Sequence, residues 1–199
     1  SSNVALVPST DGAVAFDGSG DELTLSSTSD FTFTTNNYTI ECFVYYTATS
    51  SGYVYDFRSG DANAPALSIS SGTLYAGGAG NNMTVSNIIT TGKWYHIALV
   101  RNSNTETIYI DGIAYNTQSN SNNLAQTTLS IGNRYAATFY YHSGFISNLH
   151  VVKGTALYTS NFTPPSAPIT SVENTKLLCC KSQTSATAAD VTPGTITAN

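Results

Sequence analysis

The feature that most constrains the fold of this chain is the spacing of its apolar residues. In no stretch of twelve residues do they recur with a helical period. Short runs of β-branched and aromatic residues instead alternate with turn-forming pairs such as Asp-Gly and Ser-Gly. A chain that turns after every few residues forms many short antiparallel strands. The sequence therefore predicts an all-β protein, built as a sandwich or a barrel.

The run WYHIALVR is the most informative of the predicted strands. Its even-numbered residues, Trp94 to Val100, face one way, and its odd-numbered residues, Tyr95 to Arg101, face the other. Because both faces are mostly apolar, we expect a central strand that is covered on both sides. A polar hairpin loop and the Asp111-Gly112 turn then make a three-stranded meander. The predicted strands span 12–17, 22–25, 38–46, 52–57, 66–70, 73–78, 82–86, 94–101, 105–111, 113–117, 128–132, 144–153 and 175–180.

The last fifty residues differ in character from the rest. Residues 154–170 begin with a segment that could form one helical turn, and three prolines then force an extended crossing of the surface. The strand at 175–180 is expected to return beside the first strand and close the domain. Beyond it the chain is rich in Ser, Thr and Ala. We therefore predict one domain over residues 1–181 and a linker or docking tail over 182–199.

The composition limits the partners of this chain. Its 199 residues suffice for one domain with its own core. Only 10% of them are charged, and seven Lys and Arg leave a net charge of -5. So few cations disfavour binding to nucleic acid or to an anionic membrane surface, and no apolar run approaches the length of a membrane helix. Cys42 is expected to be a small buried hydrophobe. Adjacent Cys179 and Cys180 are expected to be reduced, with a vicinal disulfide as the alternative.

Five stretches, in order, resemble the laminin-G-like, concanavalin A-type jelly-roll family. They are VAFDGSGDELTL, DFTFTTNNYTIECFVY, GKWYHIALVRNSNTETIYIDG, LSIGNR and GFISNLHVVKGTALYTSNFTPP. The resemblance implies a jelly-roll, an antiparallel β-sandwich. The ending VVKGTALYTSNFTPP, with LLCC and TPGTITAN, further resembles tandem modules in tail-fibre and other virion proteins of marine bacteriophages. Many members carry an acidic residue where this chain has Ser147 and Asn148, which weakens the expectation of a family-type calcium site.

Residues with catalytic chemistry are few and scattered. His96 shares its strand face with apolar residues, and the resemblance implies a structural histidine, hydrogen-bonded inside the sandwich. Glycosidases on this fold place paired acids on one strand, whereas Glu41, Asp56, Glu106 and Asp111 lie far apart in the sequence. The chain has no Gly-x-Ser-x-Gly motif for a nucleophilic serine. We therefore predict that the chain is not an enzyme.

The aromatic loop at 133–144 is the strongest candidate for a binding site. Exposed tyrosines offer flat faces with a polar tip, which suits sugars and protein interfaces. The alternative is that these tyrosines pack the edge of the sandwich. If the loop binds, the sequence favours a contact between subunits over a sugar. The candidate ligand-binding residues are Arg134, Tyr135, Tyr140, Tyr141 and His142.

Calcium is the one cofactor that the sequence leaves open. Asp61 and Asn63, or Asn81 and Asn82, could supply oxygen ligands in rim loops. The alternative is that these residues form ordinary Asx turns.

These observations predict a non-catalytic virion module, either a tail-fibre or a capsid-surface domain. Its rim loops would attach to host-surface glycans or to other virion subunits, with a homo-oligomer as one form of assembly. The alternative is a secreted, lectin-like carbohydrate-binding module of a larger protein. The expected location is accordingly the virion surface or the extracellular space.

Overall fold

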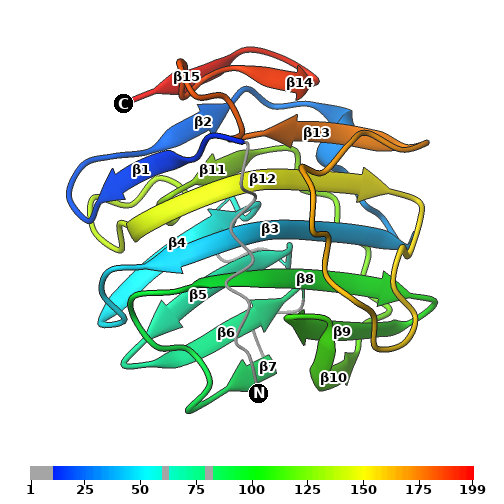
Figure 1. Ribbon diagram of the computed structural model, residues 1–199. Helices are drawn as coiled ribbons and strands as arrows, with labels where there is room; N and C mark the ends of the chain where they lie inside the picture. Colours follow the sequence, from blue (N-terminus) through cyan, green and yellow to red (C-terminus); the bar gives the residue numbers. More distant parts are fainter. Residues whose placement is uncertain (1–10, 60–62, 79–82) are drawn as a thin grey trace.

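The computed structural model describes residues 11–59, 63–78 and 83–199. Two antiparallel sheets lie face to face (Figure 1). Helical structure in the described ranges is limited to the 3₁₀ turn η1 (Ser29–Phe31), whose N-cap residue Thr28 accepts a hydrogen bond from the Asp30 amide. The prediction of an all-β antiparallel sandwich is confirmed.

Sheet A has the strand order β10-β9-β8-β3-β12-β13-β14. β1 also pairs with β12, so β1 and β13 lie along different parts of β12. The closing strand β13 thus returns near the first strand, as predicted. The strands of sheet A are β1 (Val14–Asp17), β3 (Tyr38–Tyr46), β8 (Trp94–Asn102), β9 (Thr105–Ile110), β10 (Ile113–Ser119), β12 (Ser143–Lys153), β13 (Thr175–Cys179) and β14 (Ala189–Val191).

Sheet B has the order β15-β2-β11-β4-β5-β6-β7. Each segment predicted as a strand forms one, with ends that differ by a few residues. The strands of sheet B are β2 (Leu23–Leu25), β4 (Ser51–Asp56), β5 (Ala66–Ser70), β6 (Thr73–Gly77), β7 (Met83–Val85), β11 (Leu129–Ile131) and β15 (Ile196–Ala198).

The core fills the space between the two sheets. Alternate residues of each strand point into it, as the pleat of a strand requires. On β8 these are Tyr95, Ile97 and Leu99, which join the main hydrophobic cluster. The residues between them, His96 and Ala98, are also fully buried, although they face away from the core. The prediction that this strand is covered on both sides is therefore confirmed.

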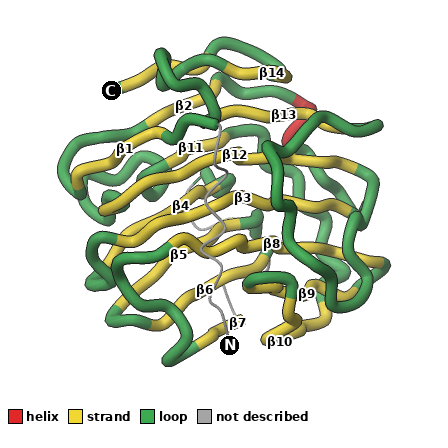
Figure 2. The backbone as a smooth tube through the Cα atoms, in the orientation of Figure 1, coloured by secondary structure: helices red, strands yellow, loops and turns green. Residues whose placement is uncertain are grey.

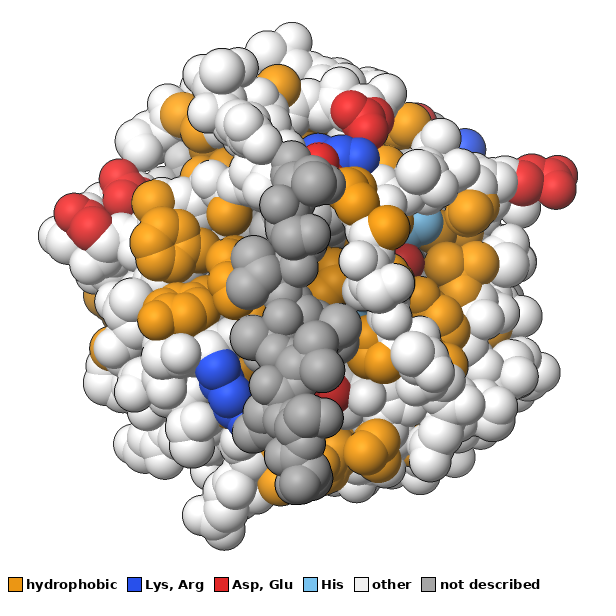
Figure 3. Space-filling model, viewed as in Figure 1, with side chains coloured by type: hydrophobic (Ala, Val, Ile, Leu, Met, Phe, Trp, Pro, Cys, Tyr) orange, Lys and Arg blue, Asp and Glu red, His pale blue; other side chains and the backbone are white. Residues whose placement is uncertain are grey.

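Residues 154–170, here called the strap, provide that second cover. They form no helical turn but cross the outer face of sheet A, the face turned away from sheet B, as an extended loop (Figure 2). The rings of Tyr158 and Phe162 stack with centroids 3.6 Å apart and planes 6° apart. They pack against Ala98 and Tyr109 of the sheet. Figure 3, viewed from this side, shows hydrophobic side chains among few charged ones.

Residues 182–199 were predicted to be a linker or a docking tail. In the structure they lie along both sheets. β14 pairs with β13 of sheet A, and β15 pairs with β2 of sheet B. Ile196 of β15 is 6% exposed and belongs to the main core. The tail thereby supplies an edge strand to each sheet.

The three cysteines are buried and free. The sulfur atoms of Cys179 and Cys180 lie 3.5 Å apart, so the expected reduced state holds in this structure. None of the helical structure in the described ranges has the length and hydropathy of a membrane-spanning helix.

Candidate binding site on the outer face of sheet B

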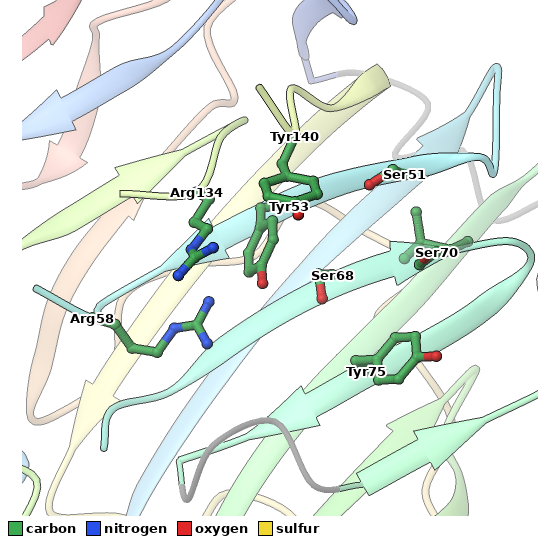
Figure 4. Close-up of a pocket in the computed structure, with 9 residues that line it drawn as sticks. Ser51, Tyr53, Arg58, Ser68, Ser70, Tyr75, Arg134 and Tyr140 are labelled. Atoms are coloured by element: carbon green, nitrogen blue, oxygen red, sulfur yellow. The ribbon is translucent and has the colours of Figure 1, made fainter. Parts of the chain in front are cut away.

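A depression of about 450 Å³ opens on the outer face of sheet B (Figure 4). Tyrosine, serine and arginine side chains make up most of its lining. Strands β4, β5 and β6 supply its floor, and the loop between β11 and β12 supplies one wall. The described residues that line it are Ser51, Tyr53, Arg58, Ser68, Ile69, Ser70, Tyr75, Arg134 and Tyr140.

The centre of the depression is a row of three side chains across neighbouring strands. Tyr53 on β4 pairs with Ser68 on β5, and Ser68 pairs with Tyr75 on β6. Neighbouring strands lie about 4.8 Å apart, so the backbones of the two tyrosines stand roughly 10 Å apart. The small Ser68 leaves an open floor between two half-buried aromatic rings. This arrangement forms a slot walled by flat, partly polar side chains.

A β-bulge brings Tyr53 into this row. The register of β4 against β5 shifts between Tyr53 and Tyr55, so one extra residue, Val54, enters the strand. The extra residue changes which side chains face outward. Tyr53 is half-buried at the surface, whereas Tyr55, two residues later, is fully buried in the core. Without the bulge, both tyrosines would share one face.

Tyr140 stands at the rim with an unusual backbone. Its φ of 78° lies in the left-handed region, which costs a non-glycine residue roughly 1–3 kcal/mol. The amide of Tyr53 donates a hydrogen bond of 3.0 Å to the Tyr140 carbonyl. The two rings meet edge-on, with centroids 6.0 Å apart. Sheet B therefore holds the strained backbone of Tyr140, whose aromatic ring lines the depression and is 37% exposed.

Two arginines complete the wall. Arg58 donates from Nε and Nη2 to the two carboxylate oxygens of Asp56, at 2.8 and 3.0 Å. Burial opposes the charge of Arg58, but the hydrogen bond and charge of Asp56 outweigh it and raise the pKa of Arg58. The Arg58 guanidinium lies 5.2 Å from the centre of the Tyr53 ring, and that of Arg134 lies 5.9 Å from the centre of the Tyr140 ring. An arginine thus flanks each member of the Tyr53–Tyr140 ring pair.

Only some of the binding residues predicted in the 133–144 loop lie at the depression. It brings Arg134 and Tyr140 to the depression. Tyr135 and Tyr141 are half-buried and do not line it. The amide of Tyr135 instead donates to Asp56, at 3.3 Å.

For His142 the sequence prediction is wrong. Its side chain is fully buried and packs edge-on against the rings of Phe16 and Tyr46, with centroids 5.9 and 5.3 Å apart. Burial lowers the pKa of His142 to about 4. The imidazole is therefore a neutral core group at neutral pH, out of reach of a ligand at the rim.

The predicted calcium ligands stay a prediction. Asn63 is exposed on the loop between β4 and β5, and Asp61, like Asn81 and Asn82, lies outside the described residues. Among the described His, Cys, Asp and Glu side chains, no three are placed to hold one metal ion. The Ser147 hydroxyl donates a hydrogen bond to the Gly12 carbonyl at 2.7 Å.

A second polar cluster lies on the outer face of sheet A, beneath the strap. Glu41 is 2% exposed, and His150 Nδ1, His96 Nε2 and the Tyr158 hydroxyl lie 2.8, 3.0 and 2.7 Å from its oxygens. Burial opposes ionisation of Glu41, but the hydrogen bonds from His150, His96 and Tyr158 outweigh it and lower the pKa of Glu41 to about 2. The expectation that His96 lies inside the sandwich is wrong, because it faces away from the core and is buried by the strap.

This second cluster does not resemble a poised acid–base site. A cavity of about 300 Å³ beside it is lined mainly by the strap, with Val172, Glu41 and His150 completing the lining. Both carboxylate oxygens of Glu41 already accept hydrogen bonds, and His150 Nε2 lies 2.8 Å from the Thr175 hydroxyl. The cluster instead connects β3, β8 and β12 to the strap, which it anchors.

Sequence reasoning missed most of the depression. Tyr75 could have been found, because it stands alone as an outward aromatic between the buried Leu74 and Ala76. The tight Ser71-Gly72 hairpin, with positive φ at both residues, also placed β5 beside β6. Tyr53 carried no such indication, since its orientation depends on the bulge.

The sandwich, with one sheet of eight strands and one of seven, places this chain among known proteins. The model of the family Laminin_G_3, described as the concanavalin A-like lectin/glucanases superfamily, matches residues 17–157. The chain belongs to this family. The match runs from the last residue of β1 through β12 to the start of the strap, so this Laminin_G_3 domain includes every strand that lines the depression. No curated protein matches the chain by sequence.

Solved structures share the fold at low sequence identity. A Bacteroides ovatus protein assigned to carbohydrate binding has a TM-score of 0.72 and 15% identity, over 95% of this chain and 58% of its own. Mouse laminin alpha1 domains LG4-5 have a TM-score of 0.55 and 16% identity, over 81% and 48%. Domain 4 of AbnA, a GH43 extracellular arabinanase from Geobacillus stearothermophilus, in complex with arabinotriose, has 0.52 and 16%, over 72% and 71%. These likenesses show a common sandwich, and this Laminin_G_3 domain spans 58% of the Bacteroides protein's length.

Proposed function

We propose that this Laminin_G_3 domain is a lectin-like carbohydrate-binding module and that the depression on sheet B holds the sugar. The observation that carries the proposal is the row Tyr53–Ser68–Tyr75, with Tyr140 at its rim. One face of a sugar ring is a patch of C–H groups that packs on an aromatic ring, while its hydroxyls need hydrogen-bonding partners at the edge. Tyrosine supplies both, and serine and arginine add donors.

Binding is proposed in place of hydrolysis because of the groups that line the depression. Cleavage of a glycosidic bond uses a pair of carboxyl groups, one on each side of the bond. Of the described lining residues, none is an aspartate or a glutamate. Asp56, the partner of Arg58 in the wall, is an acid outside this lining and is 1% exposed.

The comparisons support the same class of function. The Bacteroides ovatus protein is assigned to carbohydrate binding, and the Geobacillus domain is in complex with arabinotriose. Both share only the fold with this chain, so they support the general class and leave the ligand open.

A glycan array tests the proposal directly. Tyr53→Ala and Tyr75→Ala should each weaken binding of the best glycan by tenfold or more, since about 1.4 kcal/mol of lost stacking corresponds to a factor of ten. Tyr115→Ala is the matched control, because Tyr115 is 41% exposed on β10 and lies outside the depression. Circular dichroism checks the fold of each variant. Binding that survives both substitutions would place the sugar site elsewhere.

We further propose, on the sequence resemblance of the closing segment, that the module belongs to a virion, where host glycans or other virion subunits would be its partners. Secretion as part of a larger carbohydrate-binding protein is the alternative. Mass spectrometry of purified particles from a phage that encodes this chain would decide between them, and light scattering of the pure protein would give its oligomeric state.

A further inference from the structure

We infer that the depression selects sugars that carry a carboxylate, such as uronic or sialic acids; this inference rests on the proposed function. The first observation is the distribution of charge. The chain has seven Lys and Arg against twelve Asp and Glu, so its overall field repels anions. Two of those seven cations, Arg58 and Arg134, nevertheless line this one depression, and the described lining residues include no acid.

The second observation is how Arg58 is held. Its Nε and Nη2 atoms bond to Asp56, which fixes the plane of the guanidinium, while the Tyr53 ring lies 5.2 Å from its carbon. Nη1 is not among the atoms that bond Asp56, and the Tyr53 side chain is a further partner of the guanidinium. A guanidinium fixed in this way can donate parallel N–H bonds to a planar carboxylate, which a lysine or a serine cannot do.

The third observation is the position of Arg134. Figure 4 shows its side chain and that of Arg58 reaching into the same space, from the β11–β12 loop and from the end of β4. A carboxylate in that space would meet both guanidinium groups while its sugar ring rests over Ser68, between Tyr53 and Tyr75. A neutral sugar would gain the stacking contacts but not the charge-assisted bonds.

Matched pairs of probes test this inference. Titration calorimetry would compare trigalacturonate with its methyl ester, and 3′-sialyllactose with lactose, because each pair differs by a carboxylate or by the sugar that bears it. We expect at least one acidic probe to bind about tenfold or more tightly than its neutral partner, which is the effect of one charge-assisted hydrogen bond. We also expect this preference to shrink as the salt concentration rises from about 50 to about 500 mM, because added salt screens the attraction between the carboxylate and the arginines.

Two variants connect the preference to this site. Arg134→Gln should weaken binding of the acidic probe at least about fivefold more than binding of its neutral partner. Lys176→Gln is the control: it removes the same charge from a residue that pairs with Asp30 and lies outside the depression. Should Arg134→Gln fail to fold, the salt dependence of the wild-type protein still tests the inference.

The outcomes separate this inference from the proposed function. Equal binding of both members of each pair, or a preference that Arg134→Gln leaves intact, overturns the inference while sugar binding stands. If no glycan binds on the array or in the calorimeter, both are overturned.

Discussion

The two outer faces of the sandwich carry similar residues but differ in what covers them. On both faces, tyrosines and positively charged or titratable side chains point outward and alternate along the strands with residues that point into the core. On sheet A the strap lies over these groups, and Glu41, His96 and His150 are at most 2% exposed. On sheet B no comparable segment covers Tyr53, Ser68 and Tyr75 in the described structure, and a depression of about 450 Å³ remains.

This difference shows that outward polar residues acquire their role from what lies above them. Beneath the strap, both oxygens of the Glu41 carboxylate are hydrogen-bonded to two histidines and a tyrosine, and this cluster serves as an anchor. On the open face, tyrosine and arginine side chains border a depression that a ligand could enter. Substitutions on sheet A should therefore change stability, and substitutions on sheet B should change binding.

The largest effect should come from Glu41→Leu. The change leaves His96, His150 and Tyr158 without their shared acceptor in a buried site, so the free energy of unfolding should fall by about 3 kcal/mol. Urea unfolding measures it. Glu173→Leu is the matched control, because Glu173 is exposed and the same exchange there should change stability by less than about 0.5 kcal/mol. Equal effects in the two variants would remove the anchoring role.

A second large effect should appear with pH at His142, which lies in the core near the open face. Its pKa is lowered from 6.5 to about 4. As the pH falls from 6.5 to 4, the unfolded chain binds a proton that the folded chain refuses, so stability should fall by about 3 kcal/mol over this window. His142→Phe keeps an aromatic ring beside Phe16 and removes the titration. Denaturant unfolding at several pH values should show a flatter profile in this variant, and parallel profiles would contradict the assignment.

Much of the sandwich was predictable, because the information is local. Alternation fixed which side of β8 faces the core, and the Asp111-Gly112 pair, with φ of 49° and 76°, makes the expected tight turn. The tail was harder to predict. β14 and β15 have three residues each, and only Ile196 among them is buried, so their pairing depends on the sheets that receive them.

Most of the Glu41 cluster and of the depression on sheet B could not be predicted from neighbouring residues in the sequence. Glu41 meets His150 and His96 only because β3 lies between β12 and β8 in the sheet. The cover over them comes from the strap, which begins more than a hundred residues after Glu41 in the chain. On sheet B, one bulge separates Tyr53, at the surface, from Tyr55, in the core. Such features follow from long-range register, and a single sequence does not display it.

A smaller effect should come from Tyr158→Phe, which tests the strap without emptying the cluster. It removes one hydrogen bond of 2.7 Å to an ionised carboxylate and retains the stacked ring, so it should cost about 2 kcal/mol. Thermal unfolding would measure the loss. Sugar binding should remain at the wild-type level, because the substitution lies on the opposite face. A weakened affinity at full folding would show that the two faces are coupled.

The smallest change in stability, with the opposite sign, is expected for Tyr140→Gly on the open face. Glycine accepts a φ of 78° without strain, but it costs roughly 0.5–1 kcal/mol of backbone entropy and loses the ring contacts of Tyr140 with Tyr53 and Phe139, so stability should hold or rise by at most about 1 kcal/mol. Affinity for the glycan should nevertheless fall about tenfold with the loss of one aromatic contact. Tyr115→Gly, at an exposed strand position without positive φ, should lose about 1 kcal/mol and keep its binding. If Tyr140→Gly bound as tightly as the wild type while gaining stability, the strained tyrosine would serve neither the fold nor the ligand, and the contrast between the two faces would lose its clearest support.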